Sequence, residues 1–540
     1  MKKIRWFGAA LALAAAPVPM LAAQQPATAA ADTSPRNWWL LDATADRFPG
    51  ISAERLHREV LAGRQPRRPV VVAIIDSGTD IEHEDLNDAL WTNAREVAGN
   101  GRDDDGNGYA DDVHGWNFIG GRDGRNVDKD TYEMVRIYAA LRRYEGARAD
   151  TLTGARRAEF DQFREVKERV ERMRRENQEE LGQVRQVEKA AEQAATILRG
   201  QIGADSLTDE RVRRISSLDP RVAQARAIFL ELASNGFTPQ AVTEYRKALE
   251  DGLRYSLNPE FDPRAIVGDN YANTAERNYG NRDVEGPRAD HGTHVAGIVG
   301  AERGNNVGVM GVVPPGVRLM ILRTVPDGDE RDKDVANAIR YAADNGANVI
   351  NMSFGKGYSP QKRAVDDAVR YAESKGVLLV HAAGNDGEDL NKYPNFPNRR
   401  FEGGGEARNW IEVGASSWNA RGKLAASFSN WGRGQVDVFA PGDAILSTVP
   451  ANRYERNSGT SMAAPVVSGV AALLMAYFPT LTAPQVKQII LDSATRYADQ
   501  MVAKPGTENE TIRFGDLSTT GGIVNVYAAF RMAERMTAGR

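Results

Sequence analysis

The chain has 540 residues, a mass of 59.0 kDa and 41% hydrophobic residues. A chain of this size and composition can bury at least one large core, which excludes an intrinsically disordered protein. Its 69 Lys and Arg residues nearly balance 73 Asp and Glu residues, so its net charge does not favour nucleic acid or an anionic membrane as a partner. No nucleic-acid-binding module is present, and no pattern indicates an oligomeric state.

The first segment, MKKIRWFGAALALAAAPVPMLAA, combines a basic start, an apolar stretch and small residues at Ala22 and Ala23. This layout is typical of a secretory signal peptide over residues 1–23. Because Pro17 and Pro19 interrupt a stretch that is short for a bilayer, we expect cleavage and export rather than membrane insertion. We expect no later stretch to be long and apolar enough to span a membrane. The chain has no cysteine, so an exported, periplasmic or extracellular protein would fold without disulfides.

From residue 70 the apolar, β-branched run VVVAIIDSG is typical of a strand buried on both faces of a parallel sheet. Similar segments follow and alternate with helical stretches such as 332–346 and 360–376. This alternation predicts right-handed βαβ crossovers and an α/β domain with a mostly parallel central sheet, whose site lies beyond the carboxyl ends of the strands. The further strands are predicted at residues 317–325, 347–355, 376–385 and 410–416.

The sequence changes character over residues 131–256, where charged residues dominate. Apolar residues from Phe163 to Leu198 follow a three-then-four spacing, which predicts one long amphipathic helix. A second helical stretch, 208–256, could fold back on it as a hairpin. We interpret the segment as a self-packing insertion rather than a partner-binding arm, because charged helical faces are usually just exposed. It divides the α/β domain into a first part, 36–130, and a second part, 257–530.

Three glycine-flanked segments hold the residue types that serine-based hydrolysis needs: IIDSGTD at Asp76, DHGTHVAG at His291 and NSGTSMAAP at Ser461. The reaction requires a hydroxyl, an imidazole that takes its proton, and a carboxylate that orients the imidazole. Asp76 ends the predicted buried strand, and Ser461 precedes an apolar helical stretch whose first N–H groups could face developing negative charge. Each segment alone is weak, because Asp-Ser-Gly is a common turn and serine often caps a helix.

Together, in the order Asp, His, Ser, these segments resemble the subtilisin family of serine endopeptidases, the subtilases. The segments NNVGVMGV, NVINMSFG, AAGNDG, FSNWG, FAPG and GGIVNVYAA extend the resemblance over about residues 38–125 and 262–530. It implies a three-layer α/β subtilisin-like fold carrying the inserted α-helical hairpin. It also implies hydrolysis of polypeptide substrates through an acyl-enzyme intermediate, with no cofactor for the chemistry.

The resemblance implies a role for each site residue. Ser461 would be the nucleophile, His291 the general base and then acid, and Asp76 the orienting carboxylate. Asn385 would stabilise the tetrahedral intermediate with its amide, although without the other segments a turn asparagine would be the better interpretation. The primary specificity pocket would have two walls, Ser353, Phe354 and Gly355 on one side and Ala382, Ala383 and Gly384 on the other. An apolar ring at Phe354 suggests a hydrophobic P1 residue, unless that ring is core.

His291 and His294 stand three apart in a chain with six histidines. A zinc site of the HExxH type would place a glutamate after the first histidine, where this chain has Gly292. We therefore expect His294 to be buried and hydrogen-bonded within its helix.

Residues 103–112, DDDGNGYADD, cluster the short oxygen ligands that calcium prefers. The spacing follows the first half of an EF-hand loop, but the twelfth position is His114 instead of glutamate. A solvated acidic turn is the alternative. By resemblance, Asp85 and Asn305 fall on positions that bind a structural calcium in subtilisins. The candidate ligands within the acidic loop are Asp103, Asp105, Asn107, Asp111 and Asp112.

Two other classes of protein compete with a peptidase. A catalytically silent binding or scaffold protein could use the same fold with the helical hairpin as its working surface. A silent relative would have no reason to keep Asp76, His291, Asn385 and Ser461 together. A serine esterase of another fold would need a G-x-S-x-G elbow and the order Ser, acid, His, which the segment around Ser461 does not have.

Overall fold

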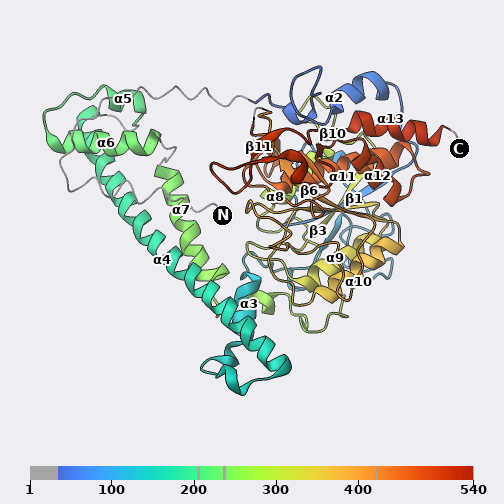
Figure 1. Ribbon diagram of the computed structural model, residues 1–540, viewed down its shortest axis with the longest axis horizontal. Coiled ribbons are helices and arrows are strands. Elements are labelled where there is room, and N and C mark those ends of the chain that lie inside the picture. The colour runs from blue at the N-terminus through green and yellow to red at the C-terminus, as the bar shows by residue number, and fades with distance from the viewer. Residues whose placement is uncertain (1–33, 204–206, 235–238, 421, 539–540) are drawn as a thin grey trace. The chain divides into compact units, whose positions relative to one another are not determined.

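The computed structural model describes residues 34–203, 207–234, 239–420 and 422–538 (Figure 1). The predicted signal peptide, residues 1–23, lies outside this part of the chain. The described residues form two compact units. The sheet unit comprises residues up to Glu133 and from Pro263 onward, and the helical unit comprises Met134–Asp262.

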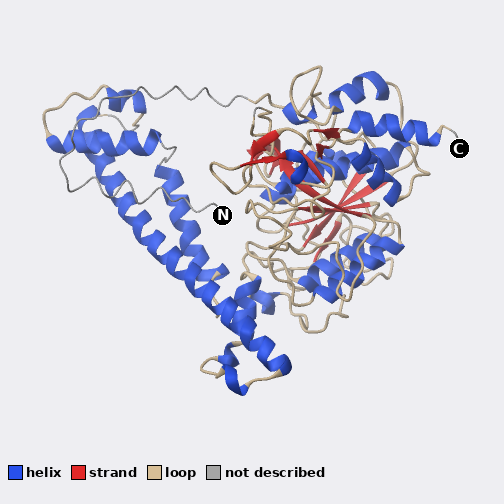
Figure 2. Cartoon of the chain, viewed as in Figure 1, coloured by secondary structure: helices blue, strands red, loops and turns tan. Residues whose placement is uncertain are grey.

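The sheet unit is built on a nine-stranded sheet with the order β10-β13-β7-β6-β5-β4-β1-β3-β2. Every neighbouring pair is parallel except β10 with β13, which confirms the predicted mostly parallel sheet (Figure 2). The strands are β1 (Val70–Asp76), β2 (Gly115–Asn117), β3 (Val317–Arg323), β4 (Val349–Met352), β5 (Leu378–Ala382), β6 (Trp410–Ser416), β7 (Val438–Pro441), β10 (Thr495–Arg496) and β13 (Gly522–Ile523).

Helices cover both faces of this sheet, so the fold has three layers. Successive residues of β1 face opposite layers, because side chains alternate along a strand. Val70, Val72 and Ile74 pack in one core cluster, and Ala73 and Ile75 pack in the other. The first cluster includes residues of α2 (Ala53–Leu56), α8 (Asp290–Gly300), α11 (Thr460–Tyr477), α12 (Ala483–Asp492) and α13 (Val526–Thr537). The second includes residues of α9 (Asp332–Asp344) and α10 (Lys362–Ser374).

One helix in the described part of the chain, α11, is long and apolar enough to cross a membrane. The expectation that no later stretch would be so apolar was therefore wrong. Its apolar window is 94% buried inside the protein, as expected of a core helix. The apolar composition of α11 thus reflects its place between the sheet and the outer helices.

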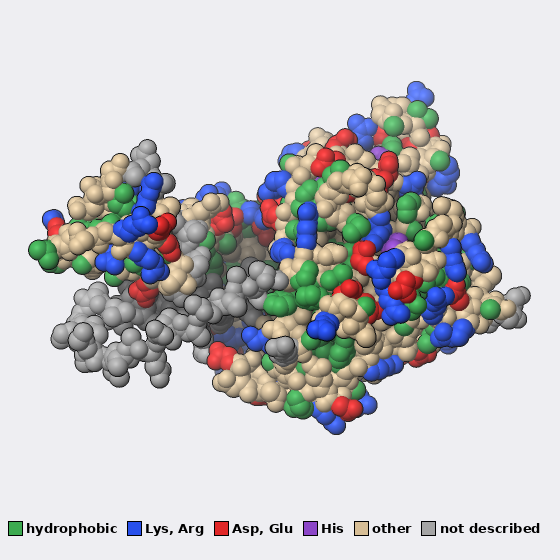
Figure 3. All heavy atoms as spheres, turned by 90° about the horizontal axis from the view of Figure 1, so that it is seen from above, with side chains coloured by type: hydrophobic (Ala, Val, Ile, Leu, Met, Phe, Trp, Pro, Cys, Tyr) green, Lys and Arg blue, Asp and Glu red, His purple; other side chains and the backbone are tan. Residues whose placement is uncertain are grey.

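Smaller elements complete the sheet unit. Two hairpins form outside the main sheet, β8 (Ile445–Val449) with β9 (Arg453–Asn457) and β11 (Met501–Ala503) with β12 (Thr511–Arg513). Short helical turns are η2 (Trp38–Leu40), η3 (His57–Leu61), η4 (Asn87–Ala89), η8 (Pro263–Ile266) and η9 (Phe514–Asp516). On the side shown in Figure 3, basic and acidic side chains are interspersed, in keeping with the near balance of charge.

The helical unit is organised by one 49-residue helix, α4 (Gly154–Ile202), against which α6 and α7 pack. The second predicted helical stretch is divided, and proline stands at the first residue of both α6 and α7, where its missing N–H costs nothing. Leu181 and Val184 pack with α7, and Leu198 packs with α6. The other elements are α3 (Glu133–Ala140), η5 (Arg142–Tyr144), η6 (Ala149–Thr151), α5 (Asp209–Arg213), α6 (Pro220–Ser234), α7 (Pro239–Asp251) and η7 (Gly252–Ser256).

A buried ion cluster holds the segment after Pro263 to the first turn of α9. The Lys333 side chain is fully buried, and its Nζ lies 2.6 Å from Asp269 and 2.8 Å from Glu276. Arg264 pairs with Asp269 and Asp334, each at 2.6 Å. Burial alone would lower the pKa of Arg264, but the charge of Asp334 and the hydrogen bonds to Asp334 and Asp269 together outweigh burial and raise the pKa. The charges in this cluster are stable in the interior because each is paired.

Lys333→Met should lower the free energy of unfolding by about 3–5 kcal/mol, because it leaves the Asp269 carboxylate buried beside a single cation. Chemical denaturation in a Ser461→Ala background measures this. The exposed Lys375→Met is the matched control, and an equal effect of the two substitutions would contradict the interpretation.

Candidate active site

The sheet order brings the predicted site residues to one edge. β1, β4 and β5 are neighbours, and Asp76, Ser353 and Asn385 lie at or just after their carboxyl ends. Two helices begin with the remaining residues, since His291 is the second residue of α8 and Ser461 is the second residue of α11. Strands that run in parallel therefore explain why these segments meet despite their separation in sequence.

Asp76 and His291 are directly hydrogen-bonded. Asp76 is 1% exposed, and its Oδ1 lies 2.7 Å from Nδ1 of His291 and accepts the Ser77 N–H, also at 2.7 Å. An Nδ1–H held by a carboxylate leaves the lone pair of the neutral ring on Nε2. The pair is therefore arranged so that Nε2 of His291 can accept a proton.

Ser461 is held by a reciprocal pair of hydrogen bonds with Ser353. The Ser461 hydroxyl donates to the carbonyl oxygen of Ser353 at 3.0 Å, and the Ser353 hydroxyl donates to the carbonyl oxygen of Ser461 at 2.9 Å. The second bond has a local cause, because Pro465 lies four residues further along α11 and has no N–H to donate to Ser461. Ser353 supplies the missing donor. The Ser461 hydroxyl thus bonds Ser353, and the role of His291 as its general base stays a prediction.

Two buried side chains support Ser353. The side-chain amide of Asn351 donates through Nδ2 to the Ser353 hydroxyl, and the Ser468 hydroxyl donates to Oδ1 of Asn351, both at 2.9 Å. Asn351 and Ser468 are fully buried. A chain of hydrogen bonds thus runs from the middle of α11 through the end of β4 to the backbone of Ser461.

Asn385 is oriented toward the start of α11. Its Oδ1 accepts the backbone N–H of Thr460 at 2.8 Å and the Thr460 hydroxyl at 3.1 Å. The amide Nδ2 is then the donor that Asn385 can offer beside Ser461. The preceding Gly384 has φ +100°, and a Cβ there would lie 2.4 Å from Nδ2 of Asn430. Only glycine fits this turn, which Asn430 braces by accepting the N–H groups of Asp386 and Glu388.

Most side chains of the predicted pocket walls are buried, so at this edge the walls present mainly their backbone. Ser353 and Phe354 are 3% and 9% exposed, and Ala382 and Ala383 are buried, whereas Gly355 is exposed. The Phe354 ring belongs to the core cluster that contains Trp410. This burial favours a core role for Phe354, and the hydrophobic P1 preference stays a prediction.

Sequence reasoning missed a buried pair behind these walls. Nδ1 of His381 lies 2.9 Å from Glu412, whose other oxygen accepts the Trp410 indole N–H at 2.8 Å. His381 directly precedes Ala382, and β5 and β6 place His381 opposite Glu412. The signal available in the sequence was one histidine and one glutamate, each within an otherwise apolar predicted strand.

His294 is fully buried, as predicted, but its hydrogen bonds differ from those predicted. Nε2 lies 3.1 Å from the carbonyl oxygens of Ile445 and Glu455, which belong to β8 and β9 instead of its own helix. Burial lowers the pKa of His294 to about 4, so the ring is neutral near pH 7. His294 thus joins α8 to the hairpin.

The acidic loop separates its candidate ligands into two groups. Carboxylate oxygens of Asp103, Asp105 and Glu96 lie within 4.8 Å of one another. Glu96 was missed because it precedes the acidic run. Asp111 has φ +57°, and its carboxylate pairs with Arg282 and accepts the N–H groups of Asn100 and Gly101.

Asp112 is fully buried and bonds a different set of partners. Its oxygens accept the side-chain amides of Asn93 at 2.8 Å and Asn107 at 2.9 Å, and the Tyr341 hydroxyl at 2.5 Å. The structure therefore groups Asp103 and Asp105 with Glu96, and it places Asp111 and Asp112 in other contacts.

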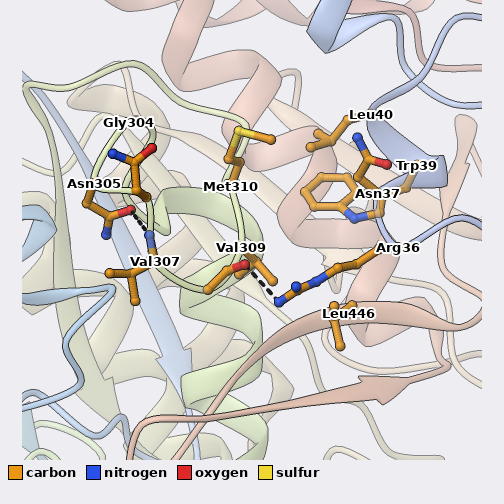
Figure 4. Close-up of a pocket in the computed structure, with 12 residues that line it drawn as sticks. Arg36, Asn37, Trp39, Leu40, Gly304, Asn305, Val307, Val309, Met310 and Leu446 are labelled. Carbon is orange, nitrogen blue, oxygen red and sulfur yellow. Dashed lines mark hydrogen bonds between the residues drawn. The ribbon is translucent and has the colours of Figure 1, made fainter.

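Asp85 and Asn305, the other predicted calcium ligands, lie together. Asp85 is fully buried, its Oδ1 accepts the Asn305 amide at 2.7 Å, and its Oδ2 accepts the Val309 N–H at 2.9 Å. The loop that carries Asn305 also borders a cavity of about 450 Å³, opposite the segment of Arg36 (Figure 4). Arg36 donates to the carbonyl oxygen of Gly308 in this loop at 2.9 Å.

The three-layer fold, the Asp76–His291 pair at the end of β1 and a serine in the first turn of α11 are the features of a protein of the subtilisin-like class. The Subtilase family model matches residues 67–510. The chain therefore belongs to the subtilase family.

Curated relatives cover the chain in part. The thermophilic serine proteinase of Bacillus sp. strain AK1 is 40% identical over 42% of this chain and 50% of its own length. Subtilisin DY of Bacillus licheniformis is 38% identical over 41% of this chain and 75% of its own length. Thermitase of Thermoactinomyces vulgaris is 41% identical over 34% of this chain and 60% of its own length. The chain thus spans about half the length of the first relative and three quarters of the second.

The pKa of His291 should lie above 6.5 in an NMR titration of the Ser461→Ala protein. Burial alone would lower this pKa, but the charge of Asp76 and its hydrogen bond outweigh burial and raise it. His294 should titrate near pH 4 in the same spectra. Asp76→Asn should bring the pKa of His291 below 6.5, and an unchanged value would show that Asp76 does not control the imidazole.

Proposed function

We propose that this subtilase is an exported serine endopeptidase that hydrolyses peptide bonds of polypeptides through an acyl-enzyme intermediate. The observation that carries the proposal is the 2.7 Å bond between buried Asp76 and His291, at the sheet edge where α11 presents Ser461. Export rests on the predicted signal peptide, and because the chain has no cysteine the exported protein would be stable without disulfides.

Acylation begins when Ser461 Oγ attacks the substrate carbonyl carbon and Nε2 of His291 takes the hydroxyl proton. Ser461 must first release the carbonyl of Ser353, which requires rotation of a single side-chain torsion. Catalytic hydrogen bonds often tighten only when substrate is bound. A serine whose hydroxyl is hydrogen-bonded to a neighbouring carbonyl oxygen is therefore compatible with this role. Asp76 stabilises the imidazolium and keeps Nδ1 as the donor.

The negative charge that develops on the carbonyl oxygen is met by two donors. They are Nδ2 of Asn385 and the backbone N–H of Ser461, which lies in the first turn of α11. His291 then returns the proton to the departing amine, and the C–N bond breaks. Water attacks the acyl-enzyme with His291 again as the base, which regenerates Ser461.

A fluorophosphonate probe should label the native protein and leave Ser461→Ala unlabelled. Asn385→Ala should lower kcat for a peptide substrate by about 100- to 1,000-fold with little change in KM, the loss known for the oxyanion-hole asparagine of subtilisin. The exposed Asn391→Ala is the control. Labelling that fails in both calcium and chelator would instead favour a silent scaffold.

We also propose that calcium stabilises the fold and takes no part in the chemistry. Asp85 is the candidate ligand because no ion pair reaches this buried carboxylate within the described residues; a bound cation would replace the N–H donors of Asn305 and Val309 at its oxygens. Asp103, Asp105 and Glu96 fit a second ion, since three carboxylates this close repel one another without a cation. Arg95 offsets part of that charge through Asp105.

Excess chelator should therefore lower the melting temperature of the Ser461→Ala protein, because an ion that binds only the folded state stabilises it. Asp85→Asn should reduce this calcium-dependent shift, whereas the exposed Asp88→Asn should leave it unchanged. Equal melting temperatures in calcium and chelator would remove the structural-ion proposal.

A further inference from the structure

Lys356, the residue after the wall Ser353–Gly355, is a buried cation that the chemistry above does not use. Its Nζ lies 2.7 Å from Glu133 and 2.8 Å from Asp332, and it donates to the carbonyl oxygen of Glu330 at 2.8 Å. The side chains of Lys356, Glu133 and Asp332 are 1%, 4% and 3% exposed. Removing such charges from water costs several kcal/mol each. The ion pairs of Lys356 can therefore form only when the chain segments that carry them are held in one arrangement.

The partners of Lys356 come from the other side of the site. Glu330 and Asp332 follow β3, whereas Lys356 follows β4. Because β3 and β4 lie on either side of β1, the two connections leave the same sheet edge and flank the end of β1 at Asp76. Lys356 thus links these connections across the end of the strand that carries Asp76.

The connection after β4 offers an open backbone edge. Lys356 exchanges backbone hydrogen bonds with Phe396, and the backbone groups of successive extended residues point to opposite edges. The N–H and C=O of Gly355 therefore face the other edge, and within the described chain no backbone hydrogen bond uses them. Gly355 is exposed, and the carbonyl that holds the Ser461 hydroxyl lies two residues away. An extended peptide binds by adding a strand to such an edge.

Glu133, one of the two carboxylates that pair with Lys356, lies at the end of the sheet unit. It is the last residue of the sheet unit and the first residue of α3, so the helical unit begins at the next residue. Shortly before Glu133 in the chain, Asp130 makes a buried two-point ion pair with Arg331, at 2.7 and 3.0 Å. The last residues of the sheet unit before the helical unit are therefore bonded to the same connection after β3 that Lys356 contacts.

We propose that Lys356 is a positioning residue that sets the separation of the connections after β3 and β4, and that it thereby selects extended polypeptides over short substrates. The proposal rests on the proposed peptidase function. An extended peptide uses the edge at Gly355 and the connection after β3, whereas a single-residue ester needs only the residues around Ser461. Loss of Lys356 removes the ion pair that ties the connection after β4 to Asp332 in the connection after β3, and it leaves Glu133 and Asp332 as unbalanced buried carboxylates.

The test compares a blocked amino-acid ester with a tetrapeptide that has the same P1 residue. Lys356→Met should lower kcat/KM for the tetrapeptide by about tenfold or more, mainly through KM, and change it for the ester by less than about twofold. Lys356→Arg, which keeps the charge, should restore part of the tetrapeptide-to-ester ratio. The exposed Lys392→Met is the control. The proposal would be overturned if Lys356→Met left the tetrapeptide-to-ester ratio of kcat/KM unchanged, whether both values fell equally or neither fell.

Two further measurements separate this proposal from the peptidase function and from misfolding. Calorimetry in the Ser461→Ala background measures tetrapeptide binding without turnover, and binding should weaken when Lys356→Met is added. Equal binding with and without Lys356 would overturn the inference, whereas a native protein that binds the peptide but cleaves neither substrate would overturn only the function. If Lys356→Met does not fold, Glu133→Gln replaces it, and an unchanged ratio in that variant is equally contradictory.

Discussion

The carboxylate of Asp76, held out of water at the end of β1, is the constraint on which the site depends. Its sole ion pair among the described residues is with His291, so α8 must begin close to the end of the strand. Gly292 permits this approach, because a Cβ there would lie 2.0 Å from the carbonyl oxygen of Gly78. One buried charge thus fixes the position of a helix and the protonation pattern of its histidine.

A second local constraint positions the nucleophile, Ser461. Pro465 removes the N–H that would bond Ser461, and the missing donor comes from Ser353 at the end of β4. The same connection exposes the backbone of Gly355 and then buries the ammonium of Lys356. Positioning of the hydroxyl by Ser353, and the proposed roles of Gly355 in strand binding and of Lys356 in spacing the connections after β3 and β4, therefore all lie in one short segment.

Much of this arrangement could be predicted from sequence, and the rest depended on contacts that sequence spacing does not encode. Long apolar runs predicted the central strands, but β10 and β13 have two residues each and leave no periodic signal. Motifs located Asp76, His291, Ser461 and Asn385, yet Glu96, the pair of His381 with Glu412, and Lys356 acquire partners only through sheet order and loop geometry. The alternation of the acidic loop suggested one ligand set, but the left-handed backbone of Asp111 turns its carboxylate to Arg282.

The central claim, that these groups act as one catalytic assembly, is tested most directly by a crystal structure of the protein after reaction with a peptidyl phosphonate. The account predicts phosphorus on Oγ of Ser461 and a phosphonyl oxygen within hydrogen-bond distance of Nδ2 of Asn385 and the N–H of Ser461. It also predicts that Nε2 of His291 reaches the adduct while Nδ1 keeps Asp76. An adduct on another residue, or one whose oxygen points away from Asn385 with His291 out of reach, would contradict it.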